Sequence, residues 1–206
     1  MQLKICGMNQ NTAEVAALKP DYLGFIFWQP SKRHFTGEMP AIPHGIKKVG
    51  VFVNASIAYI VDKVTEFNLV AVQLHGNENA AFCTSLRAHL DTIVIIKVFS
   101  INDDYDFSEL APFENLCDFF LFDTKGKLPG GNGFAFDWKV LKNYPSSKPY
   151  FLSGGIGLGE IEKLKQFFKS PESKYCHAID VNSKFEIEPG LKDVEKLITF
   201  KKVLYE

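Results

Sequence analysis

Cysteine is scarce in this sequence, and the few cysteines stand far apart. The 206 residues contain four, none of them in a CxxC pair: Cys6, Cys83, Cys117 and Cys176. Closely spaced cysteines are typical of zinc and redox sites, so we expect no metal site, and we expect no cofactor either. In a reducing compartment these residues should be free thiols. Apart from Cys6, they should pack in the core as small hydrophobic side chains.

The sequence also lacks a long apolar run and an excess of charge of either sign. No stretch approaches the roughly 18 apolar residues of a membrane span, and the first ten residues, MQLKICGMNQ, lack the apolar core of a signal peptide. The 23 basic residues balance 24 acidic ones, and no basic run is present. We therefore expect a cytoplasmic monomer whose partner is a small molecule, and not nucleic acid or a membrane.

Phenylalanine is the abundant aromatic residue, with 19 copies against 2 tryptophans. Its side chain buries a large area and has no polar atom to satisfy, so a thick apolar layer is expected. A length of 206 residues suits one domain. No linker, repeat or low-complexity segment divides the chain, so we expect a single domain over residues 1–206.

Short apolar runs with many β-branched and aromatic residues recur along the chain. There are eight, at residues 3–6, 22–28, 48–54, 69–74, 92–98, 119–123, 149–152 and 177–181. Several are apolar almost throughout, for example IVIIKVF and FFLFD. Continuous apolar runs favour parallel strands that are covered on both faces.

Helical patterns lie between most of these runs. They cover residues 12–19, the stretch after Ser56, the Phe82 to Leu90 region, residues 161–168, and the chain from Val194 onward. The connections at 36–47 and 103–116 contain prolines, so their helices should be short or absent.

Eight alternating strand–helix units predict an α/β fold, the closed eight-stranded parallel (β/α)8 barrel. The alternative is an open doubly wound sheet. That fold would need a glycine-rich phosphate loop after the first strand, and CGMNQNT is not one.

Polar or reactive residues crowd the ends of the predicted strands, whereas the strand interiors are apolar. In a (β/α)8 barrel the active site lies at the carboxyl ends of the strands. The residues at these ends are, in chain order, Cys6, Arg33, Gln73, His75, Asp123, Ser153, Gly154, Gly155, Asp180, Asn182 and Ser183. This asymmetry favours an enzyme.

The segment Ser153-Gly154-Gly155 is a candidate phosphate site. Glycine lets backbone N–H groups approach an anion closely, and the loops after strands seven and eight often bind phosphate in this fold. Asn182 and Ser183, after the eighth strand, should complete the site.

Seven motifs occur in the order seen in the phosphoribosylanthranilate isomerase family, which the chain resembles from Leu3 to the last helix. They are KICGM, PSKR, QLHG, FD, GGNGFAFDW, LSGGI and DVNSKFE. One departure concerns the second phosphate loop. Lys184 and Phe185 stand between Ser183 and Glu186, where the family usually has glycine and an aliphatic residue.

The resemblance implies a function. The family performs an Amadori rearrangement on the way to tryptophan, converting N-(5-phosphoribosyl)anthranilate into an open-chain aminoketose. By resemblance, Cys6 is the general base and Asp123 the general acid, while Asp180 orients the substrate near its amine. From its place after the second strand, we expect Arg33 to bind the anthranilate carboxylate. Gln73 and His75 are weaker candidates for substrate binding, and the glycine-rich residues 130–133 could form a loop that closes over the substrate.

Both catalytic roles need a suitable pKa. A free cysteine titrates near ~8.5 and a free aspartate near ~3.9. A nearby cation or dipole should therefore favour the Cys6 thiolate, and burial should help Asp123 keep its proton. The ordinary alternatives are a structural thiol for Cys6 and a helix N-cap for Asp123.

Two other functions deserve comparison. The histidine-pathway isomerase performs the same rearrangement on a larger substrate with two phosphates, and would favour paired aspartates and half-barrel repeats. Cys6 stands in place of an aspartate, and residues 1–103 do not clearly repeat in 104–206. A barrel that only binds a sugar phosphate would show affinity without turnover, which an activity assay decides.

Overall fold

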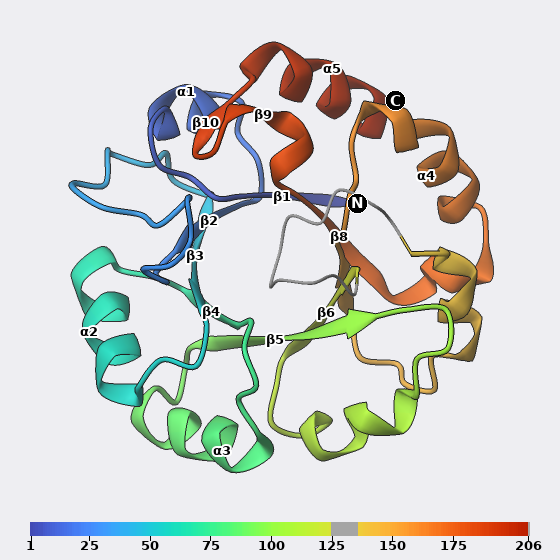
Figure 1. Ribbon diagram of the computed structural model, residues 1–206, viewed down its shortest axis with the longest axis horizontal. Helices are drawn as coiled ribbons and strands as arrows, with labels where there is room; N and C mark the ends of the chain where they lie inside the picture. The colour runs from blue at the N-terminus through green and yellow to red at the C-terminus, as the bar shows by residue number, and fades with distance from the viewer. Residues whose placement is uncertain (125–135, 206) are drawn as a thin grey trace.

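The computed structural model describes residues 1–124 and 136–205, and its central feature is a closed barrel of eight parallel strands (Figure 1). The strands are β1 (Gln2–Cys6), β2 (Tyr22–Ile26), β3 (Lys47–Phe52), β4 (Ala71–Leu74), β5 (Val94–Ile101), β6 (Phe119–Thr124), β7 (Tyr150–Leu152) and β8 (Cys176–Val181). Each strand pairs with the next, and β8 pairs with β1 to close the ring. The predicted fold class is confirmed.

Helices surround the barrel (Figure 1). The α-helices are α1 (Thr12–Ala17), α2 (Ile57–Phe67), α3 (Ala80–His89), α4 (Ile161–Phe168) and α5 (Val194–Tyr205). Short 3-10 helices are η1 (Phe107–Phe113), η2 (Trp138–Asn143), η3 (Leu158–Glu160), η4 (Pro171–Tyr175) and η5 (Ser183–Phe185). None of the described helices has the length and apolar composition needed to cross a membrane.

The two proline-containing connections behave as expected. Residues 27–46, between β2 and β3, contain no helix. The segment after β5 forms only η1, which contains Pro112. A proline has no N–H for a helical hydrogen bond and clashes with the preceding turn, so a regular α-helix is disfavoured in both places.

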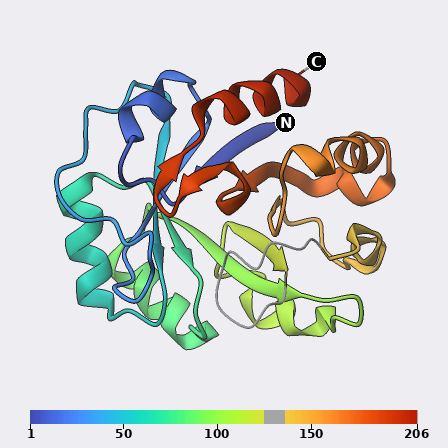
Figure 2. The ribbon, with the colours of Figure 1, turned by 45° about the horizontal axis from the view of Figure 1, so that its top comes forward.

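A small hairpin between β8 and α5 was not predicted. It consists of the antiparallel strands β9 (Glu186–Glu188) and β10 (Leu191–Lys192), joined through Gly190, whose φ of 87° is left-handed. The side chain of Asn11, just before α1, accepts a hydrogen bond from the Lys192 N–H and donates one to the Lys192 carbonyl, both at 2.9 Å. Figure 2 shows the hairpin in the same region as β1 and α1.

The core has two layers because the strands are buried on both faces. Inside the barrel, eight buried side chains form one cluster: Tyr22, Val49, Ala71, Ile96, Val98, Leu121, Phe151 and Ala178. The alternate strand residues, such as Phe120 and Phe122 of β6, face outward into a larger cluster beneath the helices. Cys83 and Cys117 are buried in this outer layer, and Cys176 packs against it, as expected for structural thiols.

Two buried lysines interrupt the apolar strands, and each has an acidic partner. The Lys4 ammonium lies 2.8 Å from Asp180 Oδ1, and the Lys97 ammonium lies 3.2 Å from Glu78 Oε2. Lys97 also donates to the Gly76 carbonyl at 2.8 Å. A buried charge is tolerated only when it is paired and hydrogen-bonded, so these lysines depend on their partners.

Candidate active site

One cavity opens at the carboxyl ends of the barrel strands, and it encloses about 730 Å³ including its open mouth. Every residue predicted for the site lines it: Cys6, Arg33, Gln73, His75, Asp123, Ser153, Gly154, Gly155, Asp180, Asn182 and Ser183. The remaining wall residues, to which the sequence assigns no role, include Trp28, Ser31, Val53 and Ile156. The topology therefore brings together side chains from seven strand ends.

Cys6 closes β1 and is only 4% exposed. A Cβ atom on the neighbouring Gly24 of β2 would lie 2.8 Å from its sulfur, so glycine makes room for the thiol. Burial raises the pKa of Cys6, the charges of Lys4 and Lys192 oppose that effect, and the net pKa stays above its ordinary value. The expected cations are present, but burial outweighs them.

The Asp180 carboxylate accepts hydrogen bonds from two other side chains, one on each oxygen. Its Oδ1 accepts from Lys4 at 2.8 Å, and its Oδ2 accepts from the Ser153 hydroxyl at 3.1 Å. Burial alone would lower the pKa of Lys4, but the charge and hydrogen bond of Asp180 hold that pKa above its ordinary value. Lys4, which the sequence places inside a strand without a role in the site, is thus a cation next to the site.

Asp123 is 7% exposed and lies near the end of β6. Its Oδ1 accepts from the Thr124 N–H at 2.9 Å, and its Oδ2 lies 3.5 Å from His75 Nε2. His75 Nδ1 is 3.1 Å from Gln73 Nε2. Gln73 and His75 therefore form a chain that leads to Asp123, and the buried Oε1 of Gln73 has no partner among the described residues.

The loop after β7 has the geometry of an anion site. Gly154 and Gly155 have left-handed φ angles of 92° and 67°. A Cβ atom on Gly154 would lie 2.2 Å from Thr124 Oγ1, so this position requires glycine. The N–H groups of both glycines donate to no other residue in the described part of the chain. Unpartnered N–H groups of this kind suit a phosphate.

Lys184 lies in the wall of the same cavity, at the position where the sequence departs from the family pattern. It belongs to η5, and its Cβ would lie 3.0 Å from a Cβ atom built on Gly157, in the loop after β7. The two candidate phosphate loops therefore pack against each other, and their shared wall includes a lysine.

Arg33 lines the cavity but is not a lone guanidinium. Its Nε lies 2.9 and 2.8 Å from the two carboxylate oxygens of Glu186, and its Nη2 lies 2.6 Å from Oε2. Lys192 binds the same carboxylate at 2.8 Å. Neither Glu186 nor Lys192 is predicted from the sequence to have a role in the site. The expected loop at residues 130–133 lies outside the described residues.

Comparison with known proteins shows which family has a similar sequence. The family model for N-(5'phosphoribosyl)anthranilate (PRA) isomerase matches residues 3–203. The N-(5'-phosphoribosyl)anthranilate isomerase of Parabacteroides distasonis is 42% identical over 209 residues, which cover 97% of this chain and 91% of the relative.

Solved structures of the same kind share the fold. A phosphoribosyl anthranilate isomerase in complex with reduced 1-(o-carboxyphenylamino)-1-deoxyribulose 5-phosphate superposes with a TM-score of 0.79 at 26% identity, covering 100% of this chain and 98% of that one. Monomers of the dimeric enzyme from Thermotoga maritima give a TM-score of 0.73 at 26% identity and the same coverage. On these grounds the chain belongs to the N-(5'-phosphoribosyl)anthranilate isomerase family.

Proposed function

We propose that this chain isomerises N-(5-phosphoribosyl)anthranilate to 1-(2-carboxyphenylamino)-1-deoxyribulose 5-phosphate, an Amadori rearrangement of tryptophan biosynthesis. One observation carries the proposal. A single cavity contains a thiol, a carboxyl group, a glycine-lined anion loop and a guanidinium, contributed by Cys6, Asp123, the Gly154-Gly155 loop and Arg33. These are the groups that a phosphorylated, carboxylated aminoaldose requires.

The first step is acid-catalysed ring opening. Asp123, as the carboxylic acid, gives its proton to the furanose ring oxygen while the bond between C1 and that oxygen breaks. The lone pair of the anthranilate nitrogen forms a C1=N double bond, which leaves an open-chain iminium and the Asp123 carboxylate. The adjacent His75 would stabilise that carboxylate, since its Nε2 lies 3.5 Å from Oδ2.

The second step removes the proton from C2. The Cys6 thiolate takes it, and the C–H electrons form a C1=C2 bond while the C1=N electrons return to nitrogen. The enol then loses its hydroxyl proton and C1 gains one, which yields the ketose. Protons only move within this sequence and no electrons leave the substrate, so the chemistry needs no cofactor. To Asp180, which lines the same cavity beside Ser153, we assign the hydrogen bond from the substrate's amine.

The functional test is turnover itself. Phosphoribosylanthranilate is generated in the cuvette from anthranilate, and the loss of its fluorescence is followed on adding the protein. Turnover in proportion to the amount of protein supports the proposal. Binding without turnover would identify a barrel that only holds a sugar phosphate.

Inorganic phosphate should inhibit competitively by occupying the loops at Gly154-Gly155 and Ser183. The free N–H groups favour an anion, and the Lys184 ammonium adds charge at the same wall. Lys184→Met removes only that charge, so the inhibition constant for phosphate should rise several-fold, as expected for one exposed cation. Absence of inhibition at high phosphate, with ionic strength held constant, would place the phosphate elsewhere.

Arg33→Ala should raise KM more than it lowers kcat, because the anthranilate carboxylate is remote from the carbons that react. The neighbouring Lys32 is exposed, and Lys32→Ala is the matched control because it removes a cation from the same turn. Steady-state kinetics on both variants make the comparison. An unchanged KM in Arg33→Ala would show that another group holds the carboxylate.

We also propose that the chain acts as a cytoplasmic monomer. Its four cysteines are free, as in a reducing compartment. The large apolar side chains that are exposed belong to different elements, for example Tyr59 of α2, Ile187 of β9 and Ile198 of α5. Because the relative from Thermotoga maritima is described as dimeric, sedimentation of the purified protein is the deciding measurement.

A further inference from the structure

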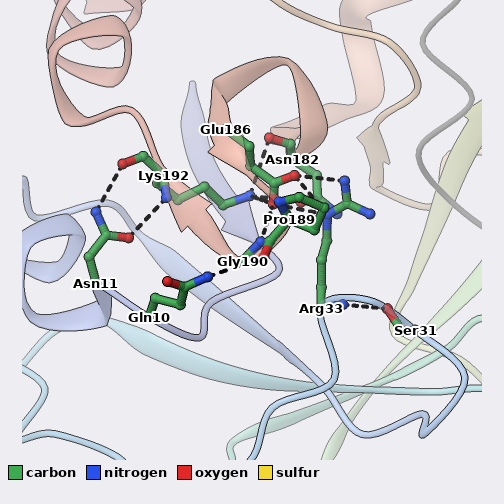
Figure 3. Close-up of polar contacts among 9 residues, drawn as sticks. All are labelled: Gln10, Asn11, Ser31, Arg33, Asn182, Glu186, Pro189, Gly190 and Lys192. Carbon is green, nitrogen blue, oxygen red and sulfur yellow. Dashed lines mark hydrogen bonds and ion pairs between the residues drawn. The ribbon is translucent and has the colours of Figure 1, made fainter.

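Arg33 is one end of a chain of three charged side chains, and the proposed mechanism does not use the other two, Glu186 and Lys192 (Figure 3). The Glu186 carboxylate accepts hydrogen bonds from Arg33 on one side and from the Lys192 ammonium, at 2.8 Å, on the other. The Gly190 N–H also donates to Glu186 Oε1 at 3.2 Å. Arg33 lines the cavity, whereas Glu186 and Lys192 do not. These two residues therefore do not touch the substrate, and Arg33 is the member of the chain that can carry their charge to its carboxylate.

Lys192 is a fully engaged ammonium group. Its side chain is completely buried, and its Nζ contacts three acceptors: the Asn182 carbonyl at 3.2 Å, Asn182 Oδ1 at 2.7 Å and Glu186 Oε1 at 2.8 Å. Three acceptors around one nitrogen match the three N–H donors of an ammonium group. Burial lowers the pKa of Lys192 below its ordinary value, and the charge and hydrogen bond of Glu186 oppose only part of that shift.

Glu186 is correspondingly an anion. Burial alone would raise its pKa, but the hydrogen bonds from Arg33 and the charge of Lys192 hold the pKa below its ordinary value. An ion pair of Arg33 with Glu186 alone would have no net charge. In a largely buried site, such a neutral pair attracts an external carboxylate weakly, because the near anion cancels the field of the cation.

Lys192 changes that balance. Two cations around one carboxylate leave the trio with a net charge of +1, and Arg33 is the member that reaches the cavity. Arg33 Nη1 donates to no other residue in the parts of the chain that the structure covers. Arg33 thus lines the cavity with a donor group left for a ligand and a net positive charge on the trio to which it belongs.

The hairpin holds this arrangement in place. The main chain of Lys192 is fixed by the reciprocal hydrogen bonds to Asn11, and Gln10 donates from its N–H to the Gly190 carbonyl at 2.9 Å. Gly7 makes space beneath, since a Cβ atom there would lie 2.6 Å from Asn182 Oδ1 and 3.0 Å from Arg33 Cδ. The position of the buried ammonium is thus set by two separate parts of the chain.

We propose that Lys192 is a specificity-determining positioning residue: it neutralises Glu186, so that Arg33 keeps a net positive charge for the substrate's aryl carboxylate. The inference rests on the proposed function, and specifically on Arg33 as the carboxylate partner. It assigns to the β9–β10 hairpin a role in choosing a carboxylated arylamine over one without the carboxylate.

The test compares two substrates that differ only in this group, N-(5-phosphoribosyl)anthranilate and N-(5-phosphoribosyl)aniline. The preference is the ratio of their kcat/KM values, with product formation followed by chromatography. A general loss of fold or of thiolate basicity affects both substrates alike and cancels in the ratio. Three full-length variants are measured beside the parent: Lys192→Met, Glu186→Gln and the double variant.

The two single variants should change the substrate preference in opposite directions. Lys192→Met leaves a neutral Arg33–Glu186 pair, so the preference should fall about tenfold. Glu186→Gln raises the charge of the group from +1 to +2, so the preference should rise. The double variant returns the charge to +1, and its preference should lie within about threefold of the parent. A merely structural Lys192 would give no rescue by Glu186→Gln.

Two failures are distinguishable. If the parent does not turn over the anthranilate substrate, the proposed function is wrong. If the parent turns it over but Lys192→Met and Glu186→Gln shift the preference in the same direction, or not at all, the role of Lys192 is wrong. If Lys192→Met fails to fold, the double variant is compared with Glu186→Gln instead. These two variants also differ only at residue 192, and neither contains an uncompensated buried carboxylate. The preference must then fall from Glu186→Gln to the double variant by the same factor.

Discussion

Asp123→Asn should lower kcat/KM by about 10²- to 10⁴-fold, the usual contribution of a positioned general acid. Asparagine keeps the shape of the side chain, and its oxygen can still accept from the Thr124 N–H, a bond that Asp123 makes at 2.9 Å. It has no acidic proton to give to the ring oxygen. The loss should therefore appear in kcat, with a thermal unfolding midpoint close to that of the parent.

Asp62→Asn is the matched control for this variant, because Asp62 is exposed on α2 and remote from the cavity. It should retain the parent's kcat/KM. If Asp123→Asn stays within threefold of the parent while it folds normally, Asp123 is not the acid. His75, the next titratable group along the same chain, would then take its place in the mechanism.

Cys6→Ser should lower kcat by about 10²-fold or more on the same scale of general-base catalysis. The serine hydroxyl fits where the thiol was, but it barely ionises near neutral pH and cannot take the C2 proton. Cys176→Ser is the matched control: Cys176 begins β8, at the opposite end of a strand from the cavity. Normal activity in Cys6→Ser would make the thiol structural and direct attention to Asp180.

Alkylation reports the ionisation of Cys6 separately from turnover. Only the thiolate reacts with iodoacetamide, and burial raises the pKa of Cys6 despite Lys4 and Lys192. A raised pKa means less thiolate at neutral pH. The inactivation rate should therefore increase with pH and then level off, with a midpoint above the pKa of ~8.5 of free cysteine. A midpoint below that value would show that the two lysines outweigh burial.

The barrel could be predicted because its strands are buried on both faces. Burial of this kind produces continuous apolar runs, which are easy to find in a sequence, and eight of them define the fold. The apolar runs do not fix the strand boundaries. The run at 92–98 becomes β5 at Val94–Ile101, because Phe99, Ser100 and Ile101 continue to pair with β6. Polar residues at the strand ends predicted the cavity for the same topological reason.

The charge network behind Arg33 could not be predicted in this way. Strands of two or three residues have no periodicity, so β9 and β10 look like a polar loop in the sequence. Lys192 and Glu186 meet only because the hairpin folds back. The pKa of Cys6 is a related case. The sequence contains the cations, but the direction of the pKa shift depends on whether burial or charge has the larger effect. Only the three-dimensional structure decides that.

The partner of Lys4 has a consequence for how the chain is made. Lys4 and Asp180 are 176 positions apart in the sequence, and they meet through the pairing of β1 with β8. During synthesis, β1 emerges first, but its ammonium has no counter-ion until the last barrel strand is complete. An unpaired lysine cannot be buried at low cost, and contacts of such long sequence separation form slowly. The nascent chain therefore carries the Cys6 thiol on a strand whose lysine is still unpaired, and the wall around Cys6 is completed only when β8 closes the ring.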